Sequence, residues 1–228
     1  MTNDQGKYAR IIDFVICVDG SANMKPFVAQ LDRVARELHS ILTENSWNFD
    51  PKEILTRAKF IVFRDYGRDG NDAMVQSRFF ELPNELDSFV KYAQSITAFG
   101  GGNSANGYEA LWLALQSDFV ATRRQDKQAI MLISCNDAFG PGKRSGAPNY
   151  PKDIPNLASL AEFWYKSPYF RNRRFLLAAP NDTFYRKMRD SMAHTVYDNT
   201  VELNSGAKDL DWHELIRWLF VGTDAEDD

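Results

Sequence analysis

Cysteines and long apolar runs are scarce in this sequence. Its two cysteines, Cys17 and Cys135, are too few for a disulfide scaffold and too far apart for a paired-cysteine metal motif. No apolar run reaches the ~18 residues that a membrane-spanning helix needs. The polar amino terminus, MTNDQGKYAR, also lacks the apolar stretch of a signal peptide. We therefore expect a cytoplasmic protein with no membrane partner and with both thiols reduced.

The sequence also has no excess of positive charge. The sequence has 27 lysines and arginines against 31 acidic residues, a net charge of −4. Such a balance offers no general attraction for nucleic acid, so we expect none as a partner. Hydrophobic residues make up 44% of the chain and charged residues 25%, as in ordinary globular proteins. With no linker or low-complexity tract, residues 1–228 are expected to form one domain. Its core spans about 10–221, between a flexible N-terminal tail and an acidic C-terminal tail.

Buried strands alternate with amphipathic helices along the chain. Near-continuous apolar runs at 11–18, 58–66 and 128–135 are typical of strands covered on both faces, and we expect the first and third to be adjacent, parallel and central. Residues 74–82 predict an antiparallel edge strand. The other expected elements are helices at 27–41, 85–95, 105–117, 156–164, 183–193 and 215–220, and strands at 174–180 and near 201. The pattern predicts an α/β fold: a doubly wound, mainly parallel sheet with one antiparallel edge strand and helices on both faces.

Polar side chains follow three segments that such a sheet would bring to one edge. They are Asp19, Ser21 and Asn23 after the first strand, Asn103 and Ser104 after a run of three glycines, and Asn136 and Asp137 after the strand that ends at residue 135. In open α/β sheets, ligands bind beyond the carboxyl ends of the strands. All these donors are oxygens, with no histidine or thiol among them. The set therefore suits Mg²⁺, Mn²⁺ or Ca²⁺ rather than zinc.

These motifs resemble those of the von Willebrand factor A family. That family's metal-ion-dependent adhesion site reads DxSxS after the first strand, a Thr or Asp after a glycine-rich loop, and an Asp after the fourth strand. Asp19, Ser21 and Asn23 match the first motif, with Asn23 where the family has its second serine, and Asp137 matches the last. FRDYG and GGGNSANGYEAL also resemble the intracellular and bacterial members. The likeness covers residues 10–221.

The resemblance implies a non-enzymatic protein-interaction module. In adhesion-site domains the protein supplies part of the metal's shell, and an Asp or Glu carboxylate of the partner completes it. By that likeness Ser21 and Asn23 would bind Mg²⁺ directly, Asp19 and Asp137 would act through water, and one of the two polar residues after the glycine run would take the remaining position. The likeness to stand-alone members also suggests a cytoplasmic scaffold in signalling or stress response.

The loop from Ala138 to Pro155 emerges at this same edge and is the expected partner-binding segment. It contains aromatic and basic residues of the kind that anchor interfaces. The candidates are Phe139, Lys143, Arg144 and Tyr150.

Two other interpretations stay open. Asp19, Ser21 and Asp137 could simply cap the helices that follow them. Alternatively, a metal-dependent hydrolase or nucleotide-binding enzyme could use Asp19 and Asp137. Against an enzyme, the sequence offers no histidine near Ser21 to act as a base and no phosphate-binding loop.

The cysteines carry a further expectation about geometry. Cys17 and Cys135 each lie two residues before an aspartate, Asp19 and Asp137. If those aspartates meet across one metal, both thiols point to the same side of the sheet. We expect them to be free, because disulfide geometry is seldom offered by adjacent parallel strands.

Overall fold

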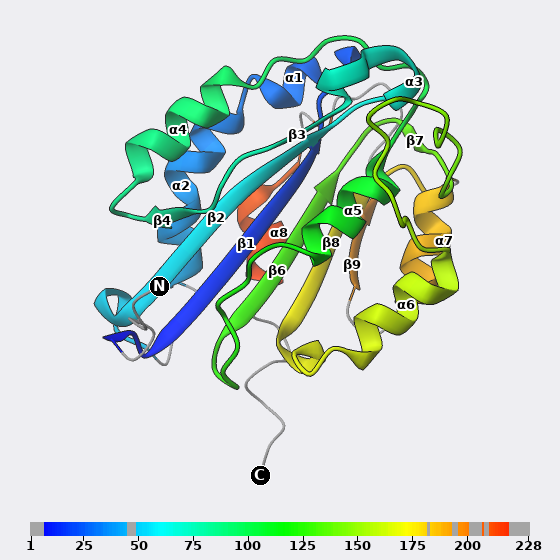
Figure 1. Cartoon of the computed structure of the whole chain (residues 1–228). Helices are drawn as coiled ribbons and strands as arrows, with labels where there is room; N and C mark the ends of the chain where they lie inside the picture. The colour runs from blue at the N-terminus through cyan, green and yellow to red at the C-terminus, as the bar shows by residue number, and fades with distance from the viewer. Residues whose placement is uncertain are drawn as a thin grey trace.

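The computed structural model describes residues 7–44, 49–181, 183–192, 196–200, 207 and 210–218. In this part of the chain a seven-stranded sheet has the order β3-β2-β1-β6-β8-β9, with β4 also paired to β2 (Figure 1). Its strands are β1 (Arg10–Asp19), β2 (Ile54–Phe63), β3 (Met74–Gln76), β4 (Phe80–Leu82), β6 (Lys127–Ile133), β8 (Arg173–Ala179) and β9 (Val196–Thr200). β3 and β4 run antiparallel to β2, and the other pairs are parallel.

Helices cover both faces of the sheet (Figure 1). One face packs against α1 (Lys25–Val28), α2 (Leu31–Glu44), α4 (Leu86–Ser95) and α8 (Trp212–Arg217). The other packs against α5 (Gly107–Leu115), α6 (Leu157–Lys166) and α7 (Phe184–Ser191). A short helix, α3 (Tyr66–Asp69), follows β2. A separate two-stranded sheet consists of β5 (Ser104–Ala105) and β7 (Asp137–Ala138). Short 3-10 turns lie at Ala22–Met24, Pro51–Glu53, Gly70–Ala73 and Phe170–Asn172.

β1 supplies side chains to both cores in alternation. Phe14 and Ile16 pack in the core beneath α2 and α4, whereas Val15 and Cys17 pack in the core beneath α5 and α6. All ten residues of β1 are buried. The continuous apolar run of this strand is thus explained by a sheet with helices on both faces.

The predicted fold class and the central strand pair are confirmed. β1 pairs in parallel with β2 on one side and with β6 on the other. The chain therefore reverses its direction of winding between β1 and β6, which is where ligands bind in doubly wound folds.

Residues 74–82 form two short strands instead of the single edge strand that alternation predicts. Ser77 causes the interruption. Its backbone nitrogen donates to the Phe60 carbonyl at 3.0 Å, and its Oγ accepts from the Phe60 nitrogen at 2.9 Å. The serine hydroxyl thus takes the place of a strand carbonyl, and the ladder resumes only at Phe80.

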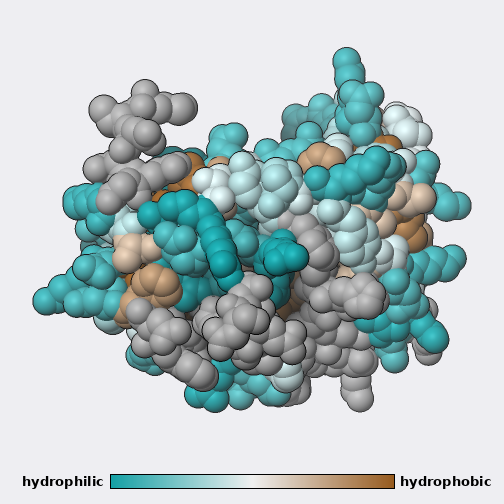
Figure 2. Space-filling view, turned by 90° about the horizontal axis from the view of Figure 1, so that it is seen from below, coloured by the Kyte–Doolittle hydropathy of each residue, from teal (hydrophilic) through white to brown (hydrophobic). Residues whose placement is uncertain are grey.

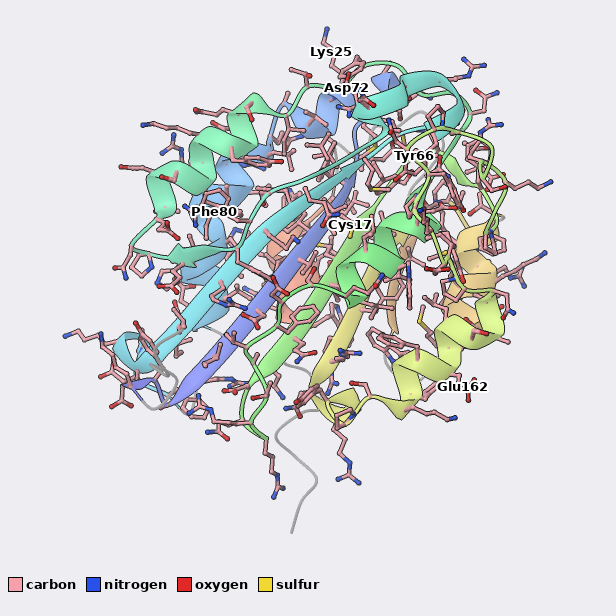
Figure 3. The ribbon with its side chains drawn as sticks, viewed as in Figure 1. Cys17, Lys25, Tyr66, Asp72, Phe80 and Glu162 are labelled. Carbon is pink, nitrogen blue, oxygen red and sulfur yellow. The ribbon has the colours of Figure 1, made fainter. Side chains whose placement is uncertain are left out.

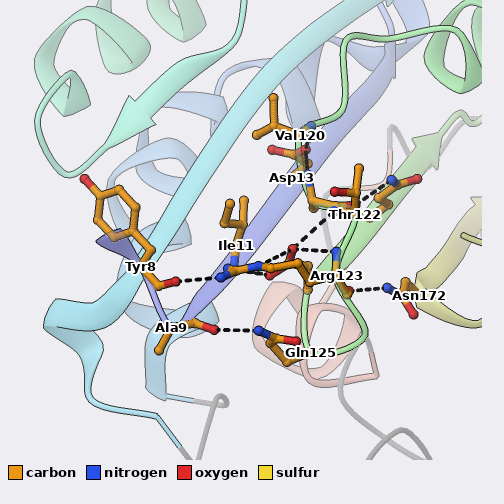
Figure 4. Close-up of polar contacts among 12 residues, drawn as sticks. Tyr8, Ala9, Ile11, Asp13, Val120, Thr122, Arg123, Gln125 and Asn172 are labelled. Atoms are coloured by element: carbon orange, nitrogen blue, oxygen red, sulfur yellow. Dashed lines mark hydrogen bonds and ion pairs between the residues drawn. The ribbon is translucent and has the colours of Figure 1, made fainter. Parts of the chain in front are cut away.

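Hydrogen bonds to two buried aspartates, Asp13 and Asp126, join the loop before β6 to the amino-terminal half of β1 (Figure 4). Asp13 accepts from the backbone nitrogens of Val120 (2.6 Å) and Ala121 (2.9 Å). Asp126 accepts from the nitrogen of Ile11 at 2.8 Å and forms an ion pair with Arg123 at 2.9 Å. These bonds fix the position of β6 beside β1.

Some expectations fall on other parts of the chain. The strand expected near residue 201 is β9, which lies slightly earlier in the chain. Leu219 and Phe220 of the last expected helix, the first six residues of the N-terminal tail and the acidic C-terminal tail lie outside the described residues. Among the helices that are described, none is both long and apolar enough to cross a lipid bilayer.

Candidate functional site

The carboxylate of Asp19 ends β1 and is completely buried. Its Oδ1 accepts from the Ser21 backbone nitrogen at 2.9 Å. Its Oδ2 accepts from Ser134 Oγ at 2.7 Å and from Asn136 Nδ2 at 2.8 Å. Burial raises the pKa of Asp19, and the hydrogen bonds from these three residues oppose that rise. Both carboxylate oxygens are therefore already satisfied by protein donors.

Asn136 links Asp19 to the rest of the first motif. The same Nδ2 lies 2.5 Å from Ser21 Oγ, while its Oδ1 accepts from Asn23 Nδ2 at 2.9 Å. The Asn136 amide thus turns its nitrogen toward Asp19 and Ser21 and its oxygen toward Asn23. We call Asp19, Ser21, Asn23, Ser134 and Asn136 the Asp19 cluster.

The register of the two central strands explains why Asn136 contacts Asp19. Cys17 pairs with Leu132 and Val18 with Ile133. Paired residues share a face and alternate residues return to it, so Asp19 shares its face with Ser134 and Asn136. The sequence shows both residues but not this register. The family motif alone therefore points to Asp137, not to Asn136, as the residue that meets Asp19.

Asp137 makes its contacts elsewhere. β7 pairs with β5, which places Asp137 beside Ser104, and the Asp137 nitrogen donates to the Asn103 carbonyl at 3.0 Å. Its Oδ1 accepts from the nitrogens of Ala138 at 2.7 Å and Phe184 at 3.3 Å. The structure thus brings Asn103, Ser104 and Asp137 together, with the Asp137 carboxylate at the start of α7.

The glycine run closes over the first motif. Gly101 has a φ of +70°, and a Cβ on it would lie 2.3 Å from Ser21 Cβ. Arg64 fixes the surrounding loops by donating to the carbonyls of Gly20 (2.9 Å), Asp72 (2.7 Å) and Thr97 (2.6 Å). The sequence analysis missed this role of Arg64, although the residue stands within its FRDYG motif.

The expected partner-binding loop is anchored by its own arginine. Arg144 donates to both carboxylate oxygens of buried Asp65, from Nε at 2.6 Å and from Nη2 at 2.9 Å. The guanidinium lies 4.1 Å from the centre of the Phe139 ring. Arg144 and Phe139 therefore hold the loop in place, whereas Lys143 is exposed.

Tyr150 provides a second anchor for the same loop. Its hydroxyl donates to Glu109, which is completely buried, and accepts from the Gly142 nitrogen at 2.8 Å. The other Glu109 oxygen accepts from Asn106 Nδ2 at 3.0 Å. Burial raises the pKa of Glu109, and the hydrogen bonds from Tyr150 and Asn106 oppose that rise. The sequence alone did not indicate this buried acid beneath the loop.

Both cysteines are buried, and neither is joined in a disulfide among the described residues. The expectation that their thiols share one face of the sheet is wrong. Cys17 packs in the core beneath α5 and α6, whereas Cys135 packs in the core beneath α2 and α4. The register again gives the reason, because Cys17 pairs with Leu132, three residues before Cys135.

The Asp19 cluster does not fit Mg²⁺ in this arrangement. It holds one carboxylate, and the Asn136 amide nitrogen lies within hydrogen-bond distance of both Asp19 Oδ2 and Ser21 Oγ. A cation that bridged Asp19 Oδ2 and Ser21 Oγ would have to occupy the position of the Asn136 amide nitrogen. Among the residues that the structure describes, no three His, Cys, Asp or Glu side chains gather as metal ligands.

Comparison by sequence identifies no relatives, since neither a protein-family model nor a curated protein matches this chain. Comparison by structure does. The von Willebrand factor domain of the type V pilus tip protein Mfa5 from Porphyromonas gingivalis superposes with a TM-score of 0.52 at 11% identity, over 95% of this chain and 97% of that one.

Two longer proteins contain the same fold. A von Willebrand factor type A protein from Catenulispora acidiphila gives a TM-score of 0.52 at 12% identity, over 93% of this chain and 43% of that one. The pilus adhesin SpaC from Lactobacillus rhamnosus GG gives 0.54 at 10% identity, over 93% of this chain and 31% of that one. This chain thus spans less than half the length of either protein. Together with the sheet order and the strand-end site, these likenesses show that the chain has the fold of a von Willebrand factor A domain.

Proposed function

We propose that this chain is a protein-interaction module that binds its partner at the carboxyl edge of the sheet. α3, β7 and the loop of residues 139–155 lie at this end (Figure 1), where β1 ends at Asp19 of the Asp19 cluster. The observation that carries the proposal is the double anchoring of the loop, by Arg144 to Asp65 and by Tyr150 to Glu109. A loop that is ordered before binding loses less conformational entropy when a partner binds.

The partner chemistry follows from the exposed charge on this loop. Lys143 is exposed directly before the Arg144 anchor, so an Asp or Glu carboxylate of the partner can pair with it. On this proposal hydrogen bonds, not a divalent cation, hold the Asp19 cluster together. The module would act as a scaffold in signalling or stress response, in the cytoplasm, and fractionation of the source cells tests that location.

A metal-dependent hydrolase is the alternative. It would need Asp19 to face substrate or a metal, yet this carboxylate is fully buried and accepts hydrogen bonds from three residues. These contacts favour the interaction module. Turnover of a panel of phosphoesters in Mg²⁺ would favour the enzyme instead.

Affinity capture from the source cell, with matched charge reversals, tests the proposal. The immobilised chain is compared with Lys143→Glu and with Lys91→Glu, which reverses an exposed lysine on α4. Each protein is used with and without chelator. We expect partner proteins that Lys143→Glu loses, Lys91→Glu retains and chelator leaves unchanged. Equal capture by both variants would contradict the proposed surface, and loss with chelator would contradict the metal-independent site.

A further inference from the structure

A second candidate site lies at the opposite end of the molecule from the Asp19 cluster. A pocket of about 480 Å³ opens between the end of α6 and the start of β8, next to Lys166, Tyr169 and Arg173. In Figure 3, Glu162 on α6 marks this end, whereas Lys25 and Tyr66 mark the other. Figure 2 shows the lower end of the molecule as largely hydrophilic, with small hydrophobic areas.

Arg173 is a buried cation with an unused donor. The residue is only 7% exposed. Its Nε donates to the neutral Oε1 of Gln128 at 2.7 Å, but its Nη1 is buried without a hydrogen-bond partner. In the part of the chain that the structure describes, no carboxylate forms an ion pair with it. Burying a charge without a counterion is costly, so an anion that reached this guanidinium would recover much of that cost.

The other side chains of the pocket complete the chemistry. Lys166 brings a second positive charge, and its ion pair with Glu162 neutralises the one carboxylate among the residues that line the pocket. Phe163 is 41% exposed and packs edge-on against Trp112 with ring centres 5.1 Å apart. Pro168 adds a further apolar surface. The pocket therefore joins an anion-binding part to an aromatic wall.

We propose that this pocket binds a small organic carboxylate with an aromatic or aliphatic body. The carboxylate pairs with Arg173, and with Lys166 at the rim, because a planar guanidinium matches carboxylate geometry. The body lies against Phe163 and Pro168. The proposal is independent of partner binding at the carboxyl edge.

Calorimetry with three probes tests the ligand class. Phenylacetate carries both required parts, phenylacetamide replaces its charge with a neutral amide, and inorganic phosphate has charge but no apolar body. We expect phenylacetate to bind at least about tenfold more tightly than either of the others, because phenylacetamide lacks the charge-assisted bond and phosphate lacks the apolar body. Equal binding of phenylacetamide would overturn the role of the charge, and equal binding of phosphate would overturn the role of the aromatic wall.

Matched variants test the location. Arg173→Met should abolish phenylacetate binding, and Lys166→Gln and Phe163→Ala should each weaken it several-fold. Lys91→Gln, at an exposed position of α4, should leave binding unchanged. The two surface variants keep the proposal testable if Arg173→Met does not fold. Unchanged binding in both Lys166→Gln and Phe163→Ala would place the ligand elsewhere and overturn the proposal.

Discussion

Gly101 and Gly142 share a left-handed backbone but differ in their surroundings. Their φ angles are +70° and +78°, yet an added Cβ would lie 2.3 Å from Ser21 at Gly101 and would meet nothing within 4 Å at Gly142. Alanine at either position bears about 1–2 kcal/mol of backbone strain. Only Gly101→Ala also forces the glycine run away from the Asp19 cluster, at a further cost of about 1–3 kcal/mol.

Urea denaturation of both variants measures this difference. We expect Gly101→Ala to lower the free energy of unfolding by more than Gly142→Ala does, with the excess reporting the contact on Ser21. Equal losses would show that the glycine run does not pack against Ser21 in solution.

The residues of the candidate site were only partly predictable. A strand followed by Asp19, Ser21 and Asn23 is visible in the sequence, because local order alone places them at a strand end. Asn136 donates to Asp19, 117 residues away, and Arg64 donates to carbonyls that are 8, 33 and 44 residues away. Their roles depend on strand register and loop packing, which no short motif encodes.

At the scale of elements, Tyr150 joins the 139–155 loop to α5 through Glu109. Tyr150→Phe would leave one Glu109 oxygen buried without a donor, so we expect a loss of about 1–3 kcal/mol in the free energy of unfolding. Tyr92→Phe, at a half-buried position of α4, serves as the control and should change stability by less than about 0.5 kcal/mol. Similar values for the two variants would mean that the loop is not anchored through Glu109.

An ion pair between Arg78, just before β4, and Glu85, just before α4, makes the stability depend on pH. Arg78 donates to both oxygens of Glu85, at 2.9 and 2.6 Å, and chiefly this lowers the pKa of Glu85 to about 2 from 4.5. A carboxyl with a lowered folded-state pKa stabilises the protein above pH 4.5, and that stability is lost as pH falls toward 2. Because the pair is partly exposed, its contribution is about 1 kcal/mol or less.

Comparing wild type with Arg78→Met between pH 6 and pH 3 isolates this pair. Burial raises the pKa of Asp19 and of Glu109, and a raised carboxyl pKa changes stability with pH in the opposite direction. Because both proteins contain these two acids, their effect cancels in the comparison. We expect the stability difference between the two proteins to shrink toward pH 3 in denaturation experiments. A constant difference would show that the pair does not form in solution.

Elements were more predictable than residues because hydrophobic patterns are local. The runs at 11–18 and 128–135 indicated central strands, and β1 and β6 occupy the centre of the sheet. The split between β3 and β4 was not predictable, since it depends on one serine hydroxyl bonding to a neighbouring strand. The anchoring roles of Asp13 in β1 and Asp126 just before β6 were not predictable either. They depend on how the loop before β6 packs against β1.

The whole molecule presents two ends with different chemistry. The carboxyl edge carries the Asp19 cluster and an anchored loop. The amino edge carries the pocket with Arg173, whose Nη1 has no hydrogen-bond partner among the described residues. Between them lies a sheet with a core on each face. On our proposal, the hydrogen bonds to Asp19 let the carboxyl edge form without a cation.

The central claim is that hydrogen bonds, not a divalent cation, hold the Asp19 cluster together. Titration of Mg²⁺ into wild type and Asn136→Asp, followed by calorimetry and thermal unfolding, tests this claim most directly. The account predicts no binding to wild type and the same melting temperature with chelator as with millimolar Mg²⁺. Asn136→Asp places a second carboxylate beside Asp19, so it should melt lower in chelator and recover in Mg²⁺, as ligand binding to the folded state requires. Saturable Mg²⁺ binding by wild type, with a melting temperature that chelator lowers, would contradict the account.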